Sequence, residues 1–224
     1  MALENTFKAT TDIDVIAGVS YDRNDLRLAQ EFNTTAGLFE YPTGSSDAVN
    51  LQAQTRWRYA AEAELHASVS SRTRFPTIFE RYSTRFGTAL PNPDLDPERA
   101  VNYELGWQGR VLDNTNLTAA LFYNDVKDMI QTVVVSAGPP QLTQTANVGN
   151  GEYYGIELGA DAQINEHLKV GGNYSLLKRS IDDPLQPNLQ ATGTPTHQGF
   201  LYVSYRPIDA VYMEIGRASC RERV

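Results

Sequence analysis

The chain has 224 residues, which suffices for one sizeable domain or for part of a larger one. Its formal net charge of -8 argues against a nucleic-acid partner, because such a partner would favour a basic face. The sequence contains no uninterrupted apolar run near the ~20 residues that a membrane-spanning helix needs, which excludes a helical membrane protein.

Hydrophobic residues make up 41% of the chain, and they recur at every second position in one segment after another. This period of two is the pattern of β-strands, whose alternate side chains face opposite sides of a sheet. We count about ten strands, from a partial first strand to Tyr212, and expect neighbours to pair antiparallel. The predicted fold class is therefore all-β, an antiparallel meander of about ten strands. The clearest alternating segments are residues 103–108, 117–123, 154–164, 168–176 and 201–205.

The connections between the expected strands alternate between short and long. Brief periplasmic turns at one end and longer external loops at the other are typical of outer-membrane barrels. A soluble β-sandwich gives no reason for this sorting. We also expect a strand over residues 17–32, longer than the ~9–11 residues that cross a membrane, and a helix of one or two turns within residues 76–82. The short connections lie near residues 10–14, 60–63, 113–116, 165–167 and 207–210, and the long ones at 33–50, 72–99, 136–146 and 182–198.

The longest loop mixes arginines with aromatic side chains. Such a loop can attract an anionic ligand through electrostatic steering and aromatic contacts. The alternative is that the arginines pair with acidic residues of the same loop and only order it, each surface pair contributing about 0–1 kcal/mol. The candidate ligand-binding residues are Arg72, Arg74, Phe79, Arg81, Tyr82, Arg85 and Phe86.

Polar residues occupy the strand positions between the apolar ones. In a soluble sandwich these residues would face water, and in a barrel they would line the lumen, so their polarity does not choose between the two. The set expected on the inner face is Asn102, Glu104, Gln108, Glu157, Asp161 and Lys169.

Motifs for catalysis or cofactor binding are absent from the sequence, which has no Gly-x-Ser-x-Gly, no phosphate-binding glycine loop and no Cys/His pair. His66, His167 and His197 lie far apart and lack the spacing of metal ligands. Asp125 and Asp128 are three residues apart, so they fall on opposite faces of a strand and do not form an acid–base pair. The sequence therefore predicts no enzyme, no metal site and no cofactor.

Several passages, taken in order, resemble those of TonB-dependent outer-membrane receptors. The first combines NPDLDPE with NYELG and is similar to the family's NP-L-PE … YE-G passage. The resemblance covers most of residues 60–212, and the order of the passages is more specific than any one of them. The passages are NPDLDPE at 92–98, NYELG at 102–106, LFYNDVKDMI at 121–130, NVG at 147–149 and YGIEL at 154–158.

This resemblance implies a 22-stranded barrel in the outer membrane of a Gram-negative bacterium, with an N-terminal plug in its lumen. Receptors of this family capture scarce ligands such as ferric siderophores or cobalamin, and the TonB complex of the inner membrane then moves the plug. The implied partners are outer-membrane lipid, a ferric siderophore or similar small ligand, and TonB through a plug that this chain lacks. The polar inner row would line the lumen and contact that plug.

The chain shows no apolar secretion signal at its N-terminus, and about ten strands are too few for the family's barrel. We therefore interpret residues 1–214 as an internal part of the barrel domain. One alternative is a small complete outer-membrane barrel that acts as a porin or surface enzyme. Another is a soluble all-β module that binds carbohydrate.

The final residues, 215–224, depart from the strand pattern and contain the single cysteine, Cys220. This segment is similar to the in-frame translation of a common sequencing adapter. We therefore expect that it is not native and leave it out of the predicted fold, as one would an expression scar. The alternative is a genuine basic tail.

Overall fold

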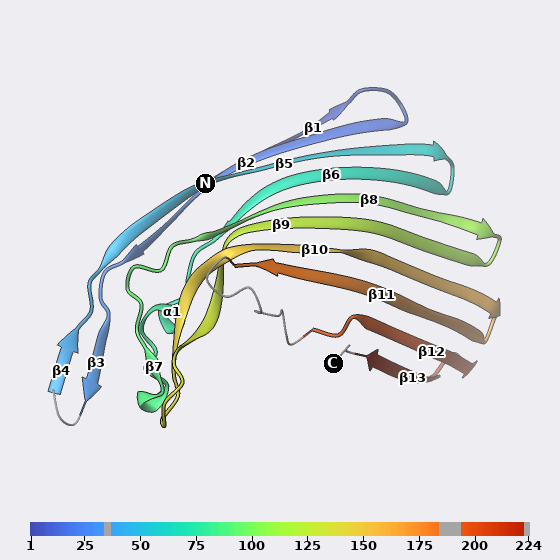
Figure 1. The fold of residues 1–224 in the computed structure, drawn as a ribbon. Helices are drawn as coiled ribbons and strands as arrows, with labels where there is room; N and C mark the ends of the chain where they lie inside the picture. Colours follow the sequence, from blue (N-terminus) through green and yellow to red (C-terminus); the bar gives the residue numbers. More distant parts are fainter. Residues whose placement is uncertain (34–36, 184–193, 222–224) are drawn as a thin grey trace.

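The computed structural model describes residues 1–33, 37–183 and 194–221. Ten strands lie side by side in one antiparallel order, which confirms the predicted meander of about ten strands (Figure 1). β7 joins β10 outside this order, and β3 and β4 form a separate hairpin. In spatial order the ten strands are β1 (Ala2–Lys8), β2 (Ile13–Leu26), β5 (Gly44–Ala60), β6 (Ala63–Arg74), β8 (Glu98–Leu112), β9 (Thr115–Ser136), β10 (Leu142–Asn165), β11 (Leu168–Asp182), β12 (His197–Ile208) and β13 (Val211–Arg221).

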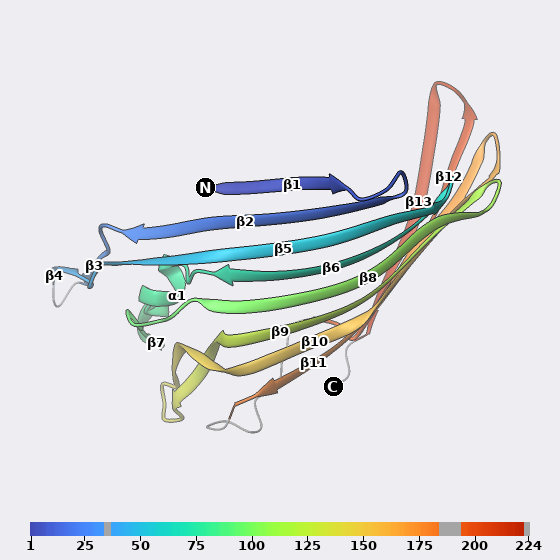
Figure 2. The same cartoon turned by 90° about the horizontal axis from the view of Figure 1, so that it is seen from above.

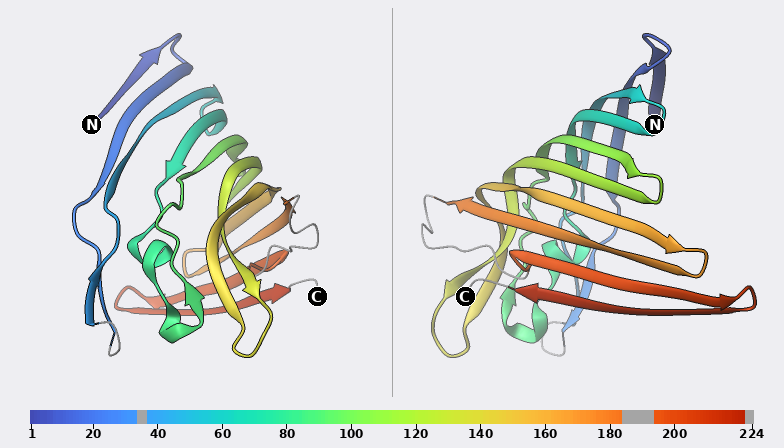
Figure 3. Two further views of the ribbon diagram at one scale, coloured as in Figure 1. Left: turned by 60° about the vertical axis from the view of Figure 1, so that its left-hand side comes forward. Right: turned by 90° about the vertical axis from the view of Figure 1, so that its right-hand side faces the viewer.

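The two faces of this sheet differ in chemistry, as the alternation predicted. Leu105 pairs in register with Ala67 and Leu121, so these three side chains share one face. Asn102, three residues away along the strand, shares the opposite face with its partner Ser70. The sheet curves so that the polar face is concave, and α1 and β7 lie inside the curve (Figures 1 and 3). The apolar face is convex, and its leucines are about half exposed, at 51% for both Leu105 and Leu121.

Aromatic side chains gather in two rows on the convex face. Tyr103, Tyr123 and Tyr154 lie in register across β8, β9 and β10. Closer to the short turns, Trp107 Nε1 donates a hydrogen bond to the Tyr59 hydroxyl at 2.7 Å. Two rows of amphipathic rings with an apolar band between them are the arrangement that a β-barrel presents to the two interfaces of a bilayer.

The external connections contain more regular structure than we expected. The strand predicted over residues 17–32 is corrected, because β2 ends at Leu26 and the chain then leaves the main sheet (Figure 2). It enters the hairpin of β3 (Gln30–Asn33) and β4 (Gly37–Glu40), and β5 begins at Gly44. The described part of the connection predicted over 33–50 is therefore mostly strand. Most of the connection at 182–198 lies outside the described residues.

The longest connection holds α1 (Ile78–Tyr82), η1 (Arg85–Gly87) and β7 (Ala89–Leu90). α1 falls inside the range predicted for a short helix. Within the three described stretches of the chain, no helix is long and apolar enough to span a membrane.

β9 and β10 bend together near their outer ends and fold over the concave side (Figure 2). Asp128 of β9 has a φ of 53°, and Gly149 of β10 has a φ of 23°. A Cβ on Gly149 would lie 1.7 Å from the Asp182 carbonyl oxygen, so only glycine fits at this bend. Beyond it, Met129 and Val148 are 2% and 4% exposed and belong to a small hydrophobic core. This core lies in the outer extension and not in the main wall.

β13 continues the antiparallel pairing with β12 as far as Arg221, so residues 215–221, which the predicted fold left out, are part of a strand. The alternation of apolar and polar side chains nevertheless ends within β13. Ile215 still shares the convex face with its partner Val203, but Arg217 lies on that same face opposite Leu201. Residues 222–224 lie outside the described part of the chain.

Candidate functional site

The longest external connection, residues 75–97, contacts the β3–β4 side of the sheet. The Tyr82 hydroxyl donates a hydrogen bond to the Pro42 carbonyl oxygen at 2.7 Å. Thr84 Oγ1 donates to the Glu31 carboxylate at 3.0 Å. These contacts join residues that are 40 and 53 positions apart in the sequence, so they fix the loop against a separate hairpin.

A buried aromatic contact strengthens this side of the loop. The ring centroids of Tyr41 and Tyr82 are 4.6 Å apart, and Tyr82 is 7% exposed. The Tyr41 hydroxyl donates to the Glu31 carboxylate. Burial, together with this carboxylate, raises the pKa of Tyr41 to about 12. Tyr41 is therefore neutral over the physiological range and remains a hydrogen-bond donor.

On its other side the loop contacts the bent outer part of β9 and β10. β7 pairs in parallel with β10, and the Asn92 side-chain amide donates to the Thr145 carbonyl oxygen at 2.9 Å. Leu95 is 1% exposed, the most deeply buried large side chain among the described residues. The loop thus connects two hairpins across one end of the concave face (Figure 3).

Thr77 is the N-cap residue of α1, and a reciprocal capping box there satisfies two free backbone N–H groups. Thr77 Oγ1 accepts from the Glu80 backbone N–H, and the Glu80 carboxylate accepts from the Thr77 backbone N–H at 2.8 Å. Arg74 contacts this carboxylate at 2.9 Å and that of Glu98 at 2.6 Å. Burial raises the pKa of the Glu80 carboxyl, but the hydrogen bonds from Thr77 and Arg74 outweigh it and hold the pKa below its usual value. Arg74 is thus committed to ordering the loop.

The seven predicted ligand residues fall into two groups in the structure. The first group makes intramolecular contacts: Arg81 donates to the Leu95 carbonyl oxygen at 2.9 Å, and Arg72 donates to the Gln52 side chain. Among the arginines of this group, Arg74 pairs with carboxylates, as in the alternative, whereas Arg72 and Arg81 donate to an amide and to a backbone carbonyl group. The members of this group are Arg72, Arg74, Arg81 and Tyr82.

The second group, Phe79, Arg85 and Phe86, lies at the exposed tip of the loop. The Arg85 guanidinium lies 6.0 Å from the centroid of the Phe79 ring, which is within the range of a cation–π contact. Phe79 is 63% exposed, and Phe86 is fully exposed. Arg85 and Phe86 have φ values of 43° and 59°, a left-handed conformation that side-chain-bearing residues seldom adopt. The strained backbone holds the Phe86 ring in solvent, where the ring contributes nothing to packing.

A hollow of about 420 Å³ lies between this tip and the outer part of β9 and β10. Phe79 and Arg85 form its loop side. Three threonines, Ile130 and Gln131 line the strand side. The threonines carry no signal in the sequence because Thr is ordinary in strands, and they are Thr132, Thr143 and Thr145.

The six residues predicted for the inner face all lie on concave-face positions by register. Three of them are paired through their side chains: Glu104 Oε1 lies 2.8 Å from His66 Nε2, and Lys169 forms an ion pair with Asp161. Gln108 and Glu157 line a second hollow, of about 480 Å³. Asn102 donates to the Ser70 hydroxyl at 3.3 Å. The concave wall is thus polar and largely hydrogen-bonded within itself.

A glycine makes room for one of these pairs. A Cβ on Gly106 would lie 2.1 Å from His66 Cε1, so the imidazole ring lies across the bare backbone of the neighbouring strand. This close approach directs His66 toward Glu104. In the parts of the chain that the structure describes, no cluster of three or more His, Cys, Asp or Glu side chains forms a metal site.

The sequence profile of the TonB-dependent receptor-like β-barrel family matches residues 2–218. The chain belongs to this family. It is 27% identical over 167 residues to the probable TonB-dependent siderophore receptor PiuA of Acinetobacter baumannii, covering 73% of this chain and 21% of the relative. It is 24% identical over 186 residues to the iron-regulated outer membrane virulence protein of Vibrio cholerae, covering 76% and 28%.

The fold is similar to that of solved receptors. The ferric yersiniabactin uptake receptor FyuA of Yersinia pestis superposes with a TM-score of 0.72 at 18% identity, over 97% of this chain and 32% of the receptor. The chain thus spans less than a third of the length of these three relatives. Receptors of this family reside in the outer membrane of Gram-negative bacteria. This chain is accordingly a wall segment of an outer-membrane barrel.

Proposed function

We propose that the chain forms part of the barrel wall of a receptor that takes up ferric siderophores or similar scarce ligands across the outer membrane. The observation that carries this proposal is the exposed tip of Phe79, Arg85 and Phe86 beside a hollow of mixed polar and apolar lining, at the end of the barrel where the long loops gather. An anionic, partly aromatic ligand matches the charge and the rings of this tip. The relatives named for siderophore uptake support the same ligand class.

The same proposal assigns a partner to the concave face. In a receptor whose plug fills the lumen, the polar row of β8, β10 and β11 contacts the plug, and the plug contacts TonB. The hollow lined by Gln108 and Glu157 presents a side-chain amide and a carboxylate. These groups offer hydrogen-bond donors and acceptors to the plug. Transport and not catalysis is the proposed activity. Residues 1–214 are the proposed native barrel segment.

The proposal is tested by ligand binding in the receptor that carries this chain. The double substitution Phe79→Ala with Arg85→Gln removes the cation–π pair and the tip charge. We expect affinity for a ferric siderophore to fall about ten-fold, equivalent to ~1.4 kcal/mol. Arg110→Gln is the matched control, because Arg110 pairs with Glu62 at the opposite, short-turn end. Equal affinities for the tip variant and the control would contradict the proposed site.

A further inference from the structure

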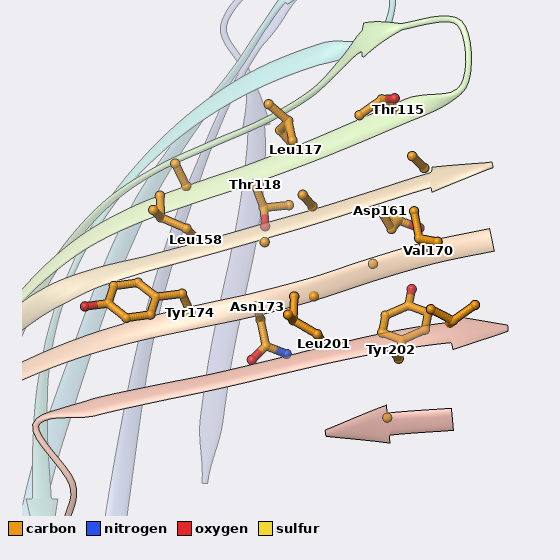
Figure 4. Close-up of a pocket in the computed structure, with 18 of the residues that line it drawn as sticks. Thr115, Leu117, Thr118, Leu158, Asp161, Val170, Asn173, Tyr174, Leu201 and Tyr202 are labelled. Carbon is orange, nitrogen blue, oxygen red and sulfur yellow. The ribbon is translucent and has the colours of Figure 1, made fainter. Parts of the chain in front are cut away.

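A hollow of about 840 Å³ lies in the convex apolar face, across the strands from β8 to β13. Side chains from four neighbouring strands surround it (Figure 4): Leu117 of β9, Leu158 of β10, Val170 of β11 and Leu201 of β12. Almost all of its lining surface is apolar. Leu117 and Val170 are each the third residue of their strand after a short turn, so the hollow lies in the half of the wall nearer the short turns.

The hollow arises from one row of paired residues. Ala160 pairs with Leu117 on one side and with Gly172 on the other, and Gly172 pairs in turn with Leu201. Two small residues therefore lie between two leucines. Leu201 leans over Gly172, where an added Cβ would lie 2.5 Å from Leu201 Cδ2, and Ala160 forms the open floor of a trench. The twist of the sheet adds to this shape, because the outer surface of a barrel is a hyperboloid that is concave along its length.

We propose that this trench, defined by Ala160 and Gly172 between Leu117 and Leu201, holds one acyl chain of a phospholipid. The family's location places the convex face against lipid, so the occupant of an apolar trench there is an acyl chain. Short turns of outer-membrane barrels are periplasmic, and the phospholipid therefore belongs to the inner, periplasmic leaflet. The inference rests on the family and on this face, and it is independent of the proposed ligand uptake.

Packing contacts retain the acyl chain in the trench. An acyl chain that enters from the bilayer core was already in hydrocarbon, so it gains no hydrophobic free energy. It gains contacts, because small residues let it approach the backbone and the flanking leucines contact it on both sides. The expected consequence is slower exchange than for lipids over the rest of the wall. Residues of β9 to β12 make up most of this lining, so the trench does not depend on residues 215–224.

The two tryptophans of the chain provide a matched pair of reporters. Trp57 and Trp107 both pair with Leu65, one from each side, but only Trp107 lines the hollow. Trp57→Phe leaves Trp107 as the reporter at the trench, and Trp107→Phe leaves Trp57 as the reporter outside it. The full chain is folded in phospholipid vesicles in which a small fraction of the lipid carries bromine atoms on its acyl chains. Bromine quenches tryptophan fluorescence on contact.

We expect Trp107 to be quenched about two-fold more strongly than Trp57 at low fractions of brominated lipid, as for a site that retains its occupant. Ala160→Leu fills the trench and should reduce the quenching of Trp107 to the level of Trp57. Ala53→Leu is the control, because Ala53 is also an exposed alanine of the convex face but lies outside the trench. Circular dichroism verifies that each variant folds.

The following results would contradict the proposed lipid site. Equal quenching of the two tryptophans at every lipid fraction would overturn the proposal. So would quenching of Trp107 that Ala160→Leu leaves unchanged in a folded chain. As a second readout, spin-labelled phospholipid should show a motionally restricted component whose amplitude Ala160→Leu lowers and Ala53→Leu leaves unchanged. The absence of such a component in the parent chain would also reject the trench as a lipid site.

Discussion

The strand wall and the external loop of residues 75–97 achieve order in different ways. In the wall, register and a period of two decide which face a side chain occupies, and many different apolar residues serve on the convex face. In the loop, individual contacts decide the structure: one buried leucine, one capping box and one hydroxyl that reaches Pro42. The stability of the wall should therefore fall when an apolar side chain is replaced by a charged one. The stability of the loop should fall when a single contacting group is removed.

The largest expected effect breaks the pattern of the wall. Leu105→Arg places a charge on the convex face between the aromatic rows, where it should destabilise the folded chain in a bilayer by about 2–4 kcal/mol. Gln108→Arg, on the concave face, should cost much less because that face is polar. Urea titration of the chain folded in vesicles measures both. Similar losses for the two variants would mean that the convex face does not meet lipid.

The second effect tests the packing of the loop. Leu95→Ala removes the most deeply buried large side chain among the described residues and should destabilise the loop by about 2 kcal/mol, at the low end for such truncations because a loop can partly collapse. Hydrogen exchange should rise in residues 75–97 and in the outer part of β10, while the wall between the aromatic rows remains protected. Faster exchange throughout the wall would contradict the separation of the two regions.

A smaller effect concerns the capping box. Glu80→Gln keeps the hydrogen bonds to Thr77 but removes the charge that contacts Arg74, whereas Glu80→Ala removes both. The alanine variant should cost about 1 kcal/mol of loop stability and the glutamine variant less. Because the pKa of Glu80 is lowered in the folded state, this contribution is present above the unfolded pKa and is lost as pH falls through the folded pKa. Acid-induced exchange of the α1 amides that is identical in parent and Glu80→Ala chains would exclude this role.

The smallest effect appears only in alkali. The pKa of Tyr41 is raised to about 12, so the folded chain retains a proton that the unfolded chain has already lost. Its contribution to stability is complete below the unfolded pKa of about 10 and declines as pH rises toward 12. Ultraviolet titration should show that the last tyrosine to ionise is lost in Tyr41→Phe. If that late ionisation persists in the variant, another tyrosine is responsible.

The wall was predictable from sequence because its information is local. The alternation of apolar and polar residues placed Leu105 and Ile156 together on the apolar face of the sheet, as the register shows. The spacing of the turns predicted the antiparallel meander. The bend in β9 and β10 was not predictable, since an aspartate at position 128 gives no sign of its positive φ. Nor was the parallel pairing of β7 with β10, which joins residues more than 50 positions apart.

The candidate site was predicted in composition but not in arrangement. The sequence identified an arginine-rich and aromatic loop, and the structure shows Arg74 and Arg81 in internal contacts, with Arg85 at the tip. This division depends on which carboxylates and carbonyl groups lie within reach of each guanidinium. Such distances follow from tertiary folding, and no periodicity in the sequence encodes them.

The position of the loop between two hairpins has a mechanical consequence. Tyr82 connects it to the β3–β4 side, and Asn92 connects it to the bent end of β10. We therefore expect a displacement of either hairpin to be transmitted through this loop to the other, so that these two outer segments of the wall move together.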